Sequence, residues 1–118
     1  MASAPLPPPT VVPLLAQAGQ AAAALKSLAH EGRLLVLCYL AEAGELSAGD
    51  LTRRVGLSQS AMSQHLARLR DDALVTTRRE AQTVYYRIAD ARVNRLLALL
   101  KDLYCPELSE DPNKGPMQ

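Results

Sequence analysis

The sequence predicts a mainly α-helical domain with one β-hairpin, and three observations support this prediction. Aromatic residues make up 3% of the chain, with no Trp and no Phe, so the core must be aliphatic, which favours helices packed through leucine stripes. Apolar residues recur at helical spacing over most of the region 14–105. Only residues 74–77 and 83–88 have the β-branched and aromatic composition of paired strands. A chain of 118 residues fits one such domain.

Three of five expected helices lie towards the ends of this domain. The first covers about residues 14–27 and is rich in alanine, and the second covers about residues 30–43 and stops at Gly44. The fifth covers about residues 91–105, with leucines at helical spacing. The first helix permits close packing, and the fifth has more apolar surface than one small domain needs. We therefore expect a homodimer built from the first and fifth helices.

The third and fourth helices are separated by a short turn that contains glycine. Ser47 can cap the third helix, with Asp50 as a box-like partner, and this helix ends at Val55. Ser58 can cap the fourth helix, which extends to about Asp72. Two helices joined in this way form the helix-turn-helix pattern, and the hairpin that follows supplies a wing. The predicted fold is therefore a winged helix-turn-helix.

Segments rich in proline flank this domain. We expect a mobile arm over residues 1–13, a folded domain over residues 14–105 and a mobile tail over residues 106–118. No run reaches the roughly 18 apolar residues of a membrane span. The proline-rich start also lacks the basic region and leucine-rich stretch of a signal peptide. The sequence therefore predicts a cytoplasmic protein without a membrane partner.

The basic charge is concentrated in the middle of the chain. The net charge is only +1, but residues 47–87 hold seven arginines against four acidic residues, a local balance of +3. The segments before and after each sum to −1. Because the guanidinium fork fits phosphate and guanine, this distribution favours duplex DNA as the partner.

The candidate DNA contacts are polar side chains of the third helix's start, the fourth helix and the hairpin. Glutamine can pair with adenine, serine adapts to either strand, and arginine reads guanine or phosphate. The alternatives are a solvated helix face and a charged hairpin tip that prevents edge pairing, and His65 could also pack between helices. The candidates are Ser47, Gln59, Ser60, Ser63, Gln64, His65, Arg68, Arg78, Arg79 and Gln82.

Several segments resemble the ArsR (SmtB-type) family of repressors. The resemblance covers about residues 20–105 and implies a winged helix dimer that binds operator DNA without its signal. It also implies that DNA is released when an inducer engages the protein. The segments that carry the resemblance are 28–33, 46–47, 57–66, 74–75 and 77–79.

The metal ligands that are common in this family are missing from this sequence. Relatives use a Cys-x-Cys pair at the third helix or Asp and His ligands on the fifth, but the third helix has no cysteine and residues 91–105 have no histidine. A zinc site needs three or four ligands, so neither a metal nor another cofactor is expected. Cys38 in the second helix and Cys105 in Leu103-Tyr104-Cys105 instead resemble the thiol-based, persulfide-sensing branch.

That branch implies that reactive sulfur species are the inducer. A di-, tri- or tetrasulfide bridge between Cys38 and Cys105 would tie the second helix to the fifth and weaken operator binding. The alternatives are two packing cysteines, an oxidant or metal sensor of the same fold, a winged helix that binds only protein, and a thiol oxidoreductase. No catalytic residue is expected, because a Cys-x-x-Cys motif and a glycine-rich cofactor loop are both missing.

Overall fold

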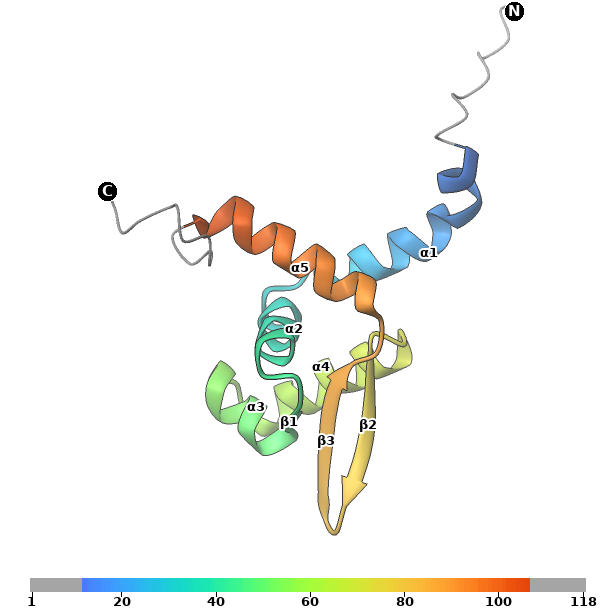
Figure 1. Ribbon diagram of the computed structural model, residues 1–118. Helices are drawn as coiled ribbons and strands as arrows, with labels where there is room; N and C mark the ends of the chain where they lie inside the picture. The colour runs from blue at the N-terminus through green and yellow to red at the C-terminus, as the bar shows by residue number, and fades with distance from the viewer. Residues whose placement is uncertain (1–11, 107–118) are drawn as a thin grey trace, which may run out of the picture.

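The computed structural model describes residues 12–106, which form five helices and a three-stranded sheet (Figure 1). Helices α1 and α5 lie at one end of the protomer, and the tip of the β2–β3 hairpin lies at the other. The expected arm and tail lie outside the described residues, except for residues 12, 13 and 106. The elements are α1 (Val12–Leu28), α2 (Glu31–Ala43), β1 (Leu46–Ser47), α3 (Ala48–Val55), α4 (Gln59–Asp71), β2 (Val75–Glu80), β3 (Thr83–Ile88) and α5 (Ala91–Tyr104).

The first two helices begin one or two residues away from their predicted starts. Helix α1 begins at Val12, so Pro13 lies in its first turn, where proline is tolerated because its missing N–H has no helical partner. Helix α2 begins at Glu31 because His30 caps it: Nδ1 of His30 accepts a hydrogen bond from the N–H of Gly32 at 3.0 Å. In the described region, no helix is long and apolar enough to cross a membrane.

The helix-turn-helix is confirmed together with its serine caps. Ser47 Oγ accepts a hydrogen bond from the Asp50 N–H at 3.1 Å, and Ser58 Oγ accepts one from the Ala61 N–H at 3.0 Å. Gly56 closes α3 in the left-handed conformation with φ 81°, which favours glycine. These local signals explain why α3 and α4 begin and end where the sequence predicts.

The sheet is antiparallel with strand order β1–β3–β2, and it differs from the prediction in two ways. Strand β2 continues to Glu80, so the turn is only Ala81–Gln82, and the predicted five-residue tip over 78–82 was wrong. The reason is that Arg78 and Arg79 pair with β3 in the ladder. The short strand β1 was missed because two residues carry no alternating pattern.

The core surrounds α2, whose Val36, Leu37 and Leu40 are almost completely buried. Helix α4 contributes three buried side chains on one face, as predicted: Met62, Leu66 and Leu69. Helix α5 buries only Val93 and Leu97. Leu96 and Leu100 of α5 are half-buried, whereas three other large apolar residues of this helix, together with leucines of α1 and α2, are exposed. The exposed large apolar residues are Leu15, Leu25, Leu35, Leu99, Leu103 and Tyr104.

Candidate nucleic-acid interface and thiol pair

The polar face of α4 is open to solvent. Burial of the opposite face directs four predicted DNA contacts outward, and all four are exposed. They present two amides and two hydroxyls from the first half of the helix, the part that meets base edges in this fold. These residues are Gln59, Ser60, Ser63 and Gln64.

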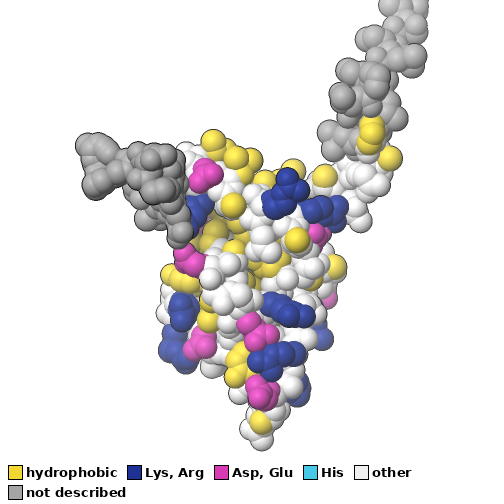
Figure 2. Space-filling view, in the orientation of Figure 1, with side chains coloured by type: hydrophobic (Ala, Val, Ile, Leu, Met, Phe, Trp, Pro, Cys, Tyr) yellow, Lys and Arg dark blue, Asp and Glu magenta, His cyan; other side chains and the backbone are white. Residues whose placement is uncertain are grey.

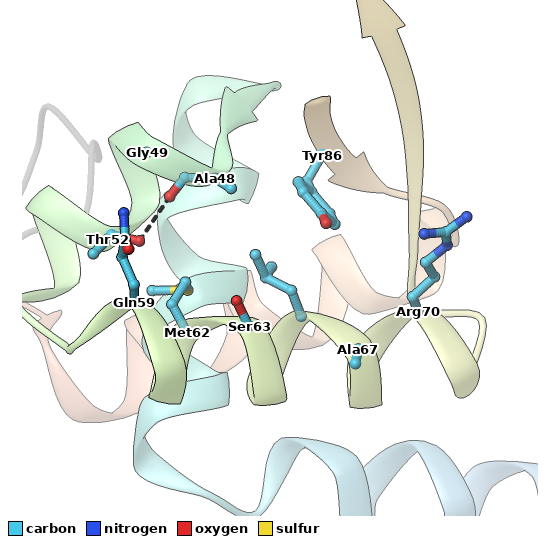
Figure 3. Close-up of a pocket in the computed structure, with 10 residues that line it drawn as sticks. Ala48, Gly49, Thr52, Gln59, Met62, Ser63, Ala67, Arg70 and Tyr86 are labelled. Carbon is cyan, nitrogen blue, oxygen red and sulfur yellow. Dashed lines mark hydrogen bonds between the residues drawn. The ribbon is translucent and has the colours of Figure 1, made fainter. Parts of the chain in front are cut away.

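A cavity of about 290 Å³ lies beside this face, between α3, α4 and β3 (Figure 3). The side chain of Arg70 rises from the end of α4 on the same side as Ser63, and the ring of Tyr86 reaches in from β3. The Thr52 hydroxyl donates a hydrogen bond to the Ala48 carbonyl at 2.8 Å, inside the first turns of α3. The cavity therefore lies where the helix-turn-helix meets strand β3 of the wing. Its polar lining residues include Thr52, Gln59, Ser63, Arg70 and Tyr86.

His65 lies on the inner side of α4, facing α2. Its ring centroid is 4.6 Å from that of His30, and a Cβ placed on Gly32 would come within 2.8 Å of its Nε2 atom. Burial lowers the pKa of His65, and the charges of His30 and Arg33 lower it further. This environment favours the neutral ring and supports helix packing, the second of the two roles expected for His65.

Two predicted arginines are held by acidic side chains. Arg68 Nε donates to Asp72 at 2.8 Å, and this hydrogen bond lowers the pKa of the Asp72 carboxyl. Arg78 donates two hydrogen bonds of 2.9 Å to Glu45 and one of 3.1 Å to Glu80. These bonds raise the pKa of Arg78 and lower that of Glu45.

The other predicted contacts lie at two places on the protomer. Arg79 is exposed on β2, and Gln82 is exposed in the hairpin turn. Ser47 is half-buried at the start of α3, where its hydroxyl is already the acceptor of the helix cap. Of the predicted contacts, only Gln59 and Ser63 line the cavity, and Ser47 directly precedes its lining residues Ala48 and Gly49.

The two cysteines are brought into electrostatic range of each other. Cys38 is exposed on α2, and Cys105, half-buried, is the C-cap of α5. Packing on the inner side of Cys38 raises the pKa of its thiol, the charges of Cys105 and Glu42 raise it further, and Lys101 lowers it. Lys101 also pairs with Glu42 at 3.7 Å. Among the described residues, His, Cys, Asp and Glu form no group of three that could hold a metal ion.

Sequence reasoning missed several residues of these two sites. Arg70 could have been found, because it lies seven residues after Ser63 and therefore on the same helix face. Glu45 could not, because it meets Arg78 only through the pairing of β1 with β3. Lys101 and Glu42 likewise come together only when α5 packs on α2.

Comparison with known proteins places this site in a family. Residues 30–77 match the family model described as bacterial regulatory protein, arsR family. The HTH-type transcriptional regulator YgaV of Escherichia coli is 53% identical over 93 residues, which cover 79% of this chain and 94% of that protein. The chain belongs to the ArsR family. As an ArsR-family protein it is a transcriptional regulator and not an enzyme.

Other ArsR-family relatives are named for different roles. The transcriptional activator HlyU of Vibrio cholerae is 54% identical over 81 residues, covering 69% of this chain and 74% of that protein. The crystal structure of the transcriptional repressor BigR from Xylella fastidiosa matches with a TM-score of 0.75 at 35% identity, covering 79% and 94% of the two chains. A homodimeric winged helix-turn-helix DNA-binding domain from Mycobacterium bovis matches with a TM-score of 0.68 at 35% identity, covering 79% and 84%. The winged helix-turn-helix fold is confirmed.

Proposed function

We propose that this ArsR-family protein is a cytoplasmic, homodimeric repressor that leaves its operator when reactive sulfur species join Cys38 to Cys105. The observation that carries the proposal is the position of the two thiols. One lies on α2, and the other ends α5, a helix that exposes Leu99, Leu103 and Tyr104. A covalent link there would act on the helix that we assign to the dimer.

The dimer is supported by apolar side chains that one protomer leaves in solvent. Leu99 is 51% exposed, Leu103 64% and Tyr104 78%. Figure 2 shows hydrophobic side chains gathered at the α5 end, whereas charged residues of both signs alternate over the half that carries the wing. A second copy that covers α1 and α5 would remove this surface from water. The related domain from Mycobacterium bovis is homodimeric.

Operator binding is assigned to the polar face of α4 and to the wing. Gln59, Ser60, Ser63 and Gln64 are the proposed base-reading residues, because they are exposed on the first half of α4. In a symmetric dimer, two such helices can meet successive major grooves roughly 34 Å apart. The related BigR is a transcriptional repressor, and repression needs only a bound operator, because an occupied operator blocks transcription by itself.

The switch needs a persulfide donor, RSSH. Each thiol takes one sulfane sulfur from a donor molecule and releases RSH, which converts Cys38 and Cys105 to persulfides. The two persulfides then condense to a trisulfide, Cys–S–S–S–Cys, and release one H₂S. The attacking species is the thiolate, which Lys101 favours at Cys38 while burial disfavours it.

The bridge would act on DNA binding through α5. It would fix the end of α5 against α2, and α2 contacts α4 through the Gly32 and His65 pair. A small shift at the dimer helices would therefore change the separation and tilt of the two α4 helices. Because the two half-sites have a fixed spacing, such a change weakens binding at both.

Two measurements on the full chain test this function. Mass spectrometry after treatment with glutathione persulfide should detect a Cys38–Cys105 crosslink that carries extra sulfur. Fluorescence anisotropy with a labelled duplex from the region upstream of its own coding sequence should show tight binding before treatment and weak binding after it. The Cys38→Ser and Cys105→Ser variants should bind the duplex with normal affinity, and persulfide treatment should leave that affinity unchanged.

Treatment of the same protein with hydrogen peroxide, compared with persulfide in the DNA-binding assay, identifies the chemical class of the inducer. Release by persulfide alone supports the proposal, and equal release by peroxide would make the protein a general oxidant sensor. If the crosslink is absent and DNA binding is unchanged by persulfide, sensing through Cys38 and Cys105 is excluded. If the untreated protein binds no duplex even at low salt, the repressor assignment itself fails.

A further inference from the structure

The two faces of the wing carry arginines in different electrostatic states. Side chains alternate between the faces of a strand, so Arg78 and Arg79 point to opposite sides of β2. The register pairs Arg78 with Tyr85 and Arg79 with Val84. Thr77, which shares a face with Arg79, pairs with Tyr86, the residue that lines the cavity. Arg79 therefore lies on the cavity side of the wing, and Arg78 lies on the other side.

Arg78 uses three of its five N–H donors in bonds to acidic side chains of the protomer. Its guanidinium binds both carboxylate oxygens of Glu45 at 2.9 Å, contacts Glu80 at 3.1 Å and lies 4.4 Å from the centroid of the Tyr85 ring. The two carboxylates balance the charge of Arg78 and that of Arg87, which shares this face of the hairpin, so this face of the wing has no net positive charge. A phosphate at Arg78 would have to compete with Glu45 and would be repelled by the two carboxylates. The contact instead ties the wing to the segment before β1.

Arg68 is occupied in a similar way at the end of α4. It pairs with Asp72 at 2.8 Å across one helical turn. The pair is neutral, and it joins the last turn of α4 to its C-cap residue. Of the arginines expected to touch DNA, two are therefore bound to acids within the protomer.

Arg70 and Arg79 differ from these two. Neither forms an ion pair with any residue in the described region 12–106. Arg70 lines the cavity from α4, on the side of the helix that carries Ser63 (Figure 3). Arg79 lies on the cavity side of the wing. Arg70 thus lines the cavity, and Arg79 lies on the strand next to β3, on the face of the hairpin that Tyr86 presents to the cavity.

We propose that Arg70 and Arg79 bind the phosphodiester backbone of the operator, whereas Arg68 and Arg78 hold the protein together. The inference rests on the proposed DNA-binding function and assigns its electrostatic part to particular residues. An unpaired guanidinium can donate two hydrogen bonds to a phosphate without breaking an existing ion pair. The cavity leaves the Arg70 side chain accessible beside the helix that we assign to base reading.

The salt dependence of binding tests this assignment, because each phosphate contact releases condensed counterions. Anisotropy titrations over a range of KCl concentrations, with the labelled upstream duplex, give the slope of log K against log salt. Each of Arg70→Gln and Arg79→Gln removes one contact from each protomer of the dimer and should reduce that slope by about 1.8, and the double variant should reduce it by about 3.6. Arg95→Gln is the matched control: it removes one exposed arginine without an ion-pair partner in the described region from α5, at the other end of the protomer.

Double variants that leave the net charge unchanged test whether Arg68 and Arg78, which form ion pairs within the protomer, contribute to phosphate binding. Glu45→Gln with Arg78→Gln, and Arg68→Gln with Asp72→Asn, remove one positive and one negative charge each, so the net charge is unchanged. Both should keep the wild-type slope. Thermal unfolding checks that each variant is folded, and the Arg68 pair supplies an independent test should the loss of Arg78 loosen the wing.

Three results would overturn the inference. Wild-type slopes for Arg70→Gln and Arg79→Gln with reduced slopes for the neutral pairs would reverse the assignment, while the proposed function would stand. Equal losses in every variant, Arg95→Gln included, would show a diffuse charge effect instead of phosphate contacts. A wild-type protein that binds no duplex would remove the proposed function and this inference together.

Discussion

Helices α4 and α5 are almost equal in length, with 13 and 14 residues, yet they expose opposite chemistry. Helix α4 buries its three large apolar residues and leaves amides and hydroxyls in water. Helix α5 buries two apolar residues and exposes Leu99, Leu103 and Tyr104. The exposed face of α4 is therefore polar and suits a hydrated, charged ligand. The exposed face of α5 is apolar and is removed from water only when another apolar surface covers it.

This difference indicates how the two helices depend on partners. The exposed amides and hydroxyls of α4 carry no free-energy penalty in the free protein, because water forms hydrogen bonds with them. The exposed leucines of α5 keep apolar surface in water until the second copy binds. The α4 end therefore tolerates the absence of DNA, whereas the α5 end should not tolerate the absence of its dimer partner. Each of the following predictions alters one side of this contrast.

The largest effect is expected from charges on the exposed face of α5. Leu99→Asp with Leu103→Asp should convert the dimer to a monomer, because two carboxylates cannot be buried unpaired in an apolar interface. Loss of the second half-site contact should lower operator affinity by roughly 100-fold or more. Sedimentation equilibrium gives the oligomeric state and anisotropy gives the affinity.

The control for this variant lies on the same helix. Asn94 is exposed on α5 and polar, so Asn94→Asp adds a charge without touching the leucines. It should remain a dimer with nearly normal affinity. A dimer that persists in the double leucine variant would assign the interface to a different surface.

The second prediction concerns the contact between α2 and α4. A methyl group on Gly32 would meet Nε2 of His65 at 2.8 Å and Cε1 of His30 at 3.4 Å, so Gly32→Ala should displace the His65 ring from its position between the two helices. We expect a loss of about 1–3 kcal/mol in the free energy of unfolding, the usual size for overpacking. Urea unfolding followed by circular dichroism measures it.

Gly19 supplies the matched substitution. It lies in α1, where a Cβ added to it would have no heavy atom within 4 Å, so Gly19→Ala should stabilise the helix by up to about 1 kcal/mol. A double-mutant cycle adds His65→Ala, which should make Gly32→Ala less costly. Equal costs in both backgrounds would show that His65 is not the group that Gly32 accommodates.

The α4 end could be predicted from the sequence because its signals are local. Ser47, Gly56 and Ser58 mark the ends of α3 and α4 within a few residues of the groups they cap. The tip of the wing was misplaced because Arg78, Arg79 and Glu80 have no β-type composition, and only their partners on β3 hold them in a strand.

The remaining features depend on residues that are distant in sequence. Glu45 meets Arg78 across 33 positions, so no pattern in the sequence could show that this arginine is occupied. Cys38 and Cys105 lie on different helices, and their pairing was expected only from a resemblance to a family. Likewise, the inward direction of His65 depends on the absence of a side chain at Gly32.

The third prediction concerns the surroundings of Cys38, where the charge of Glu42 disfavours the thiolate. Burial raises the pKa of Cys38 most, and Glu42 adds to it. Glu42→Gln removes one contribution and frees Lys101, which lowers the pKa. At a fixed pH below the thiol pKa, the alkylation rate of Cys38 by iodoacetamide should rise about two- to threefold, the size expected of a screened surface charge.

The control for Glu42→Gln is Asp102→Asn, and both are made in a Cys105→Ser background so that only Cys38 is alkylated. Asp102 is an exposed acid on α5 that does not contribute to the shift at Cys38, so its removal should leave the rate unchanged. Lys101→Gln should slow the reaction. A rate that rises equally with either acidic variant would indicate a general effect of net charge, not a local one at Cys38.

The fourth prediction concerns the residue at which α4 ends. Ala73 adopts φ 60°, and the N–H of Leu74 reaches back to the Leu69 carbonyl at 2.9 Å, which is the bond that closes a Schellman motif. Because a Cβ is strained in the left-handed region, Ala73→Gly should raise the free energy of unfolding by about 0.5–1 kcal/mol.

Ala67→Gly, on the exposed middle of the same helix, should lower the free energy of unfolding by a similar amount, since glycine there only adds backbone entropy to the unfolded chain. Opposite signs from the same substitution, six residues apart, would show that the end of α4 is set by backbone geometry; equal losses at both positions would contradict this. Because neither change touches a polar side chain of α4, operator affinity should stay constant in both, which separates the stability of the DNA-reading helix from its chemistry.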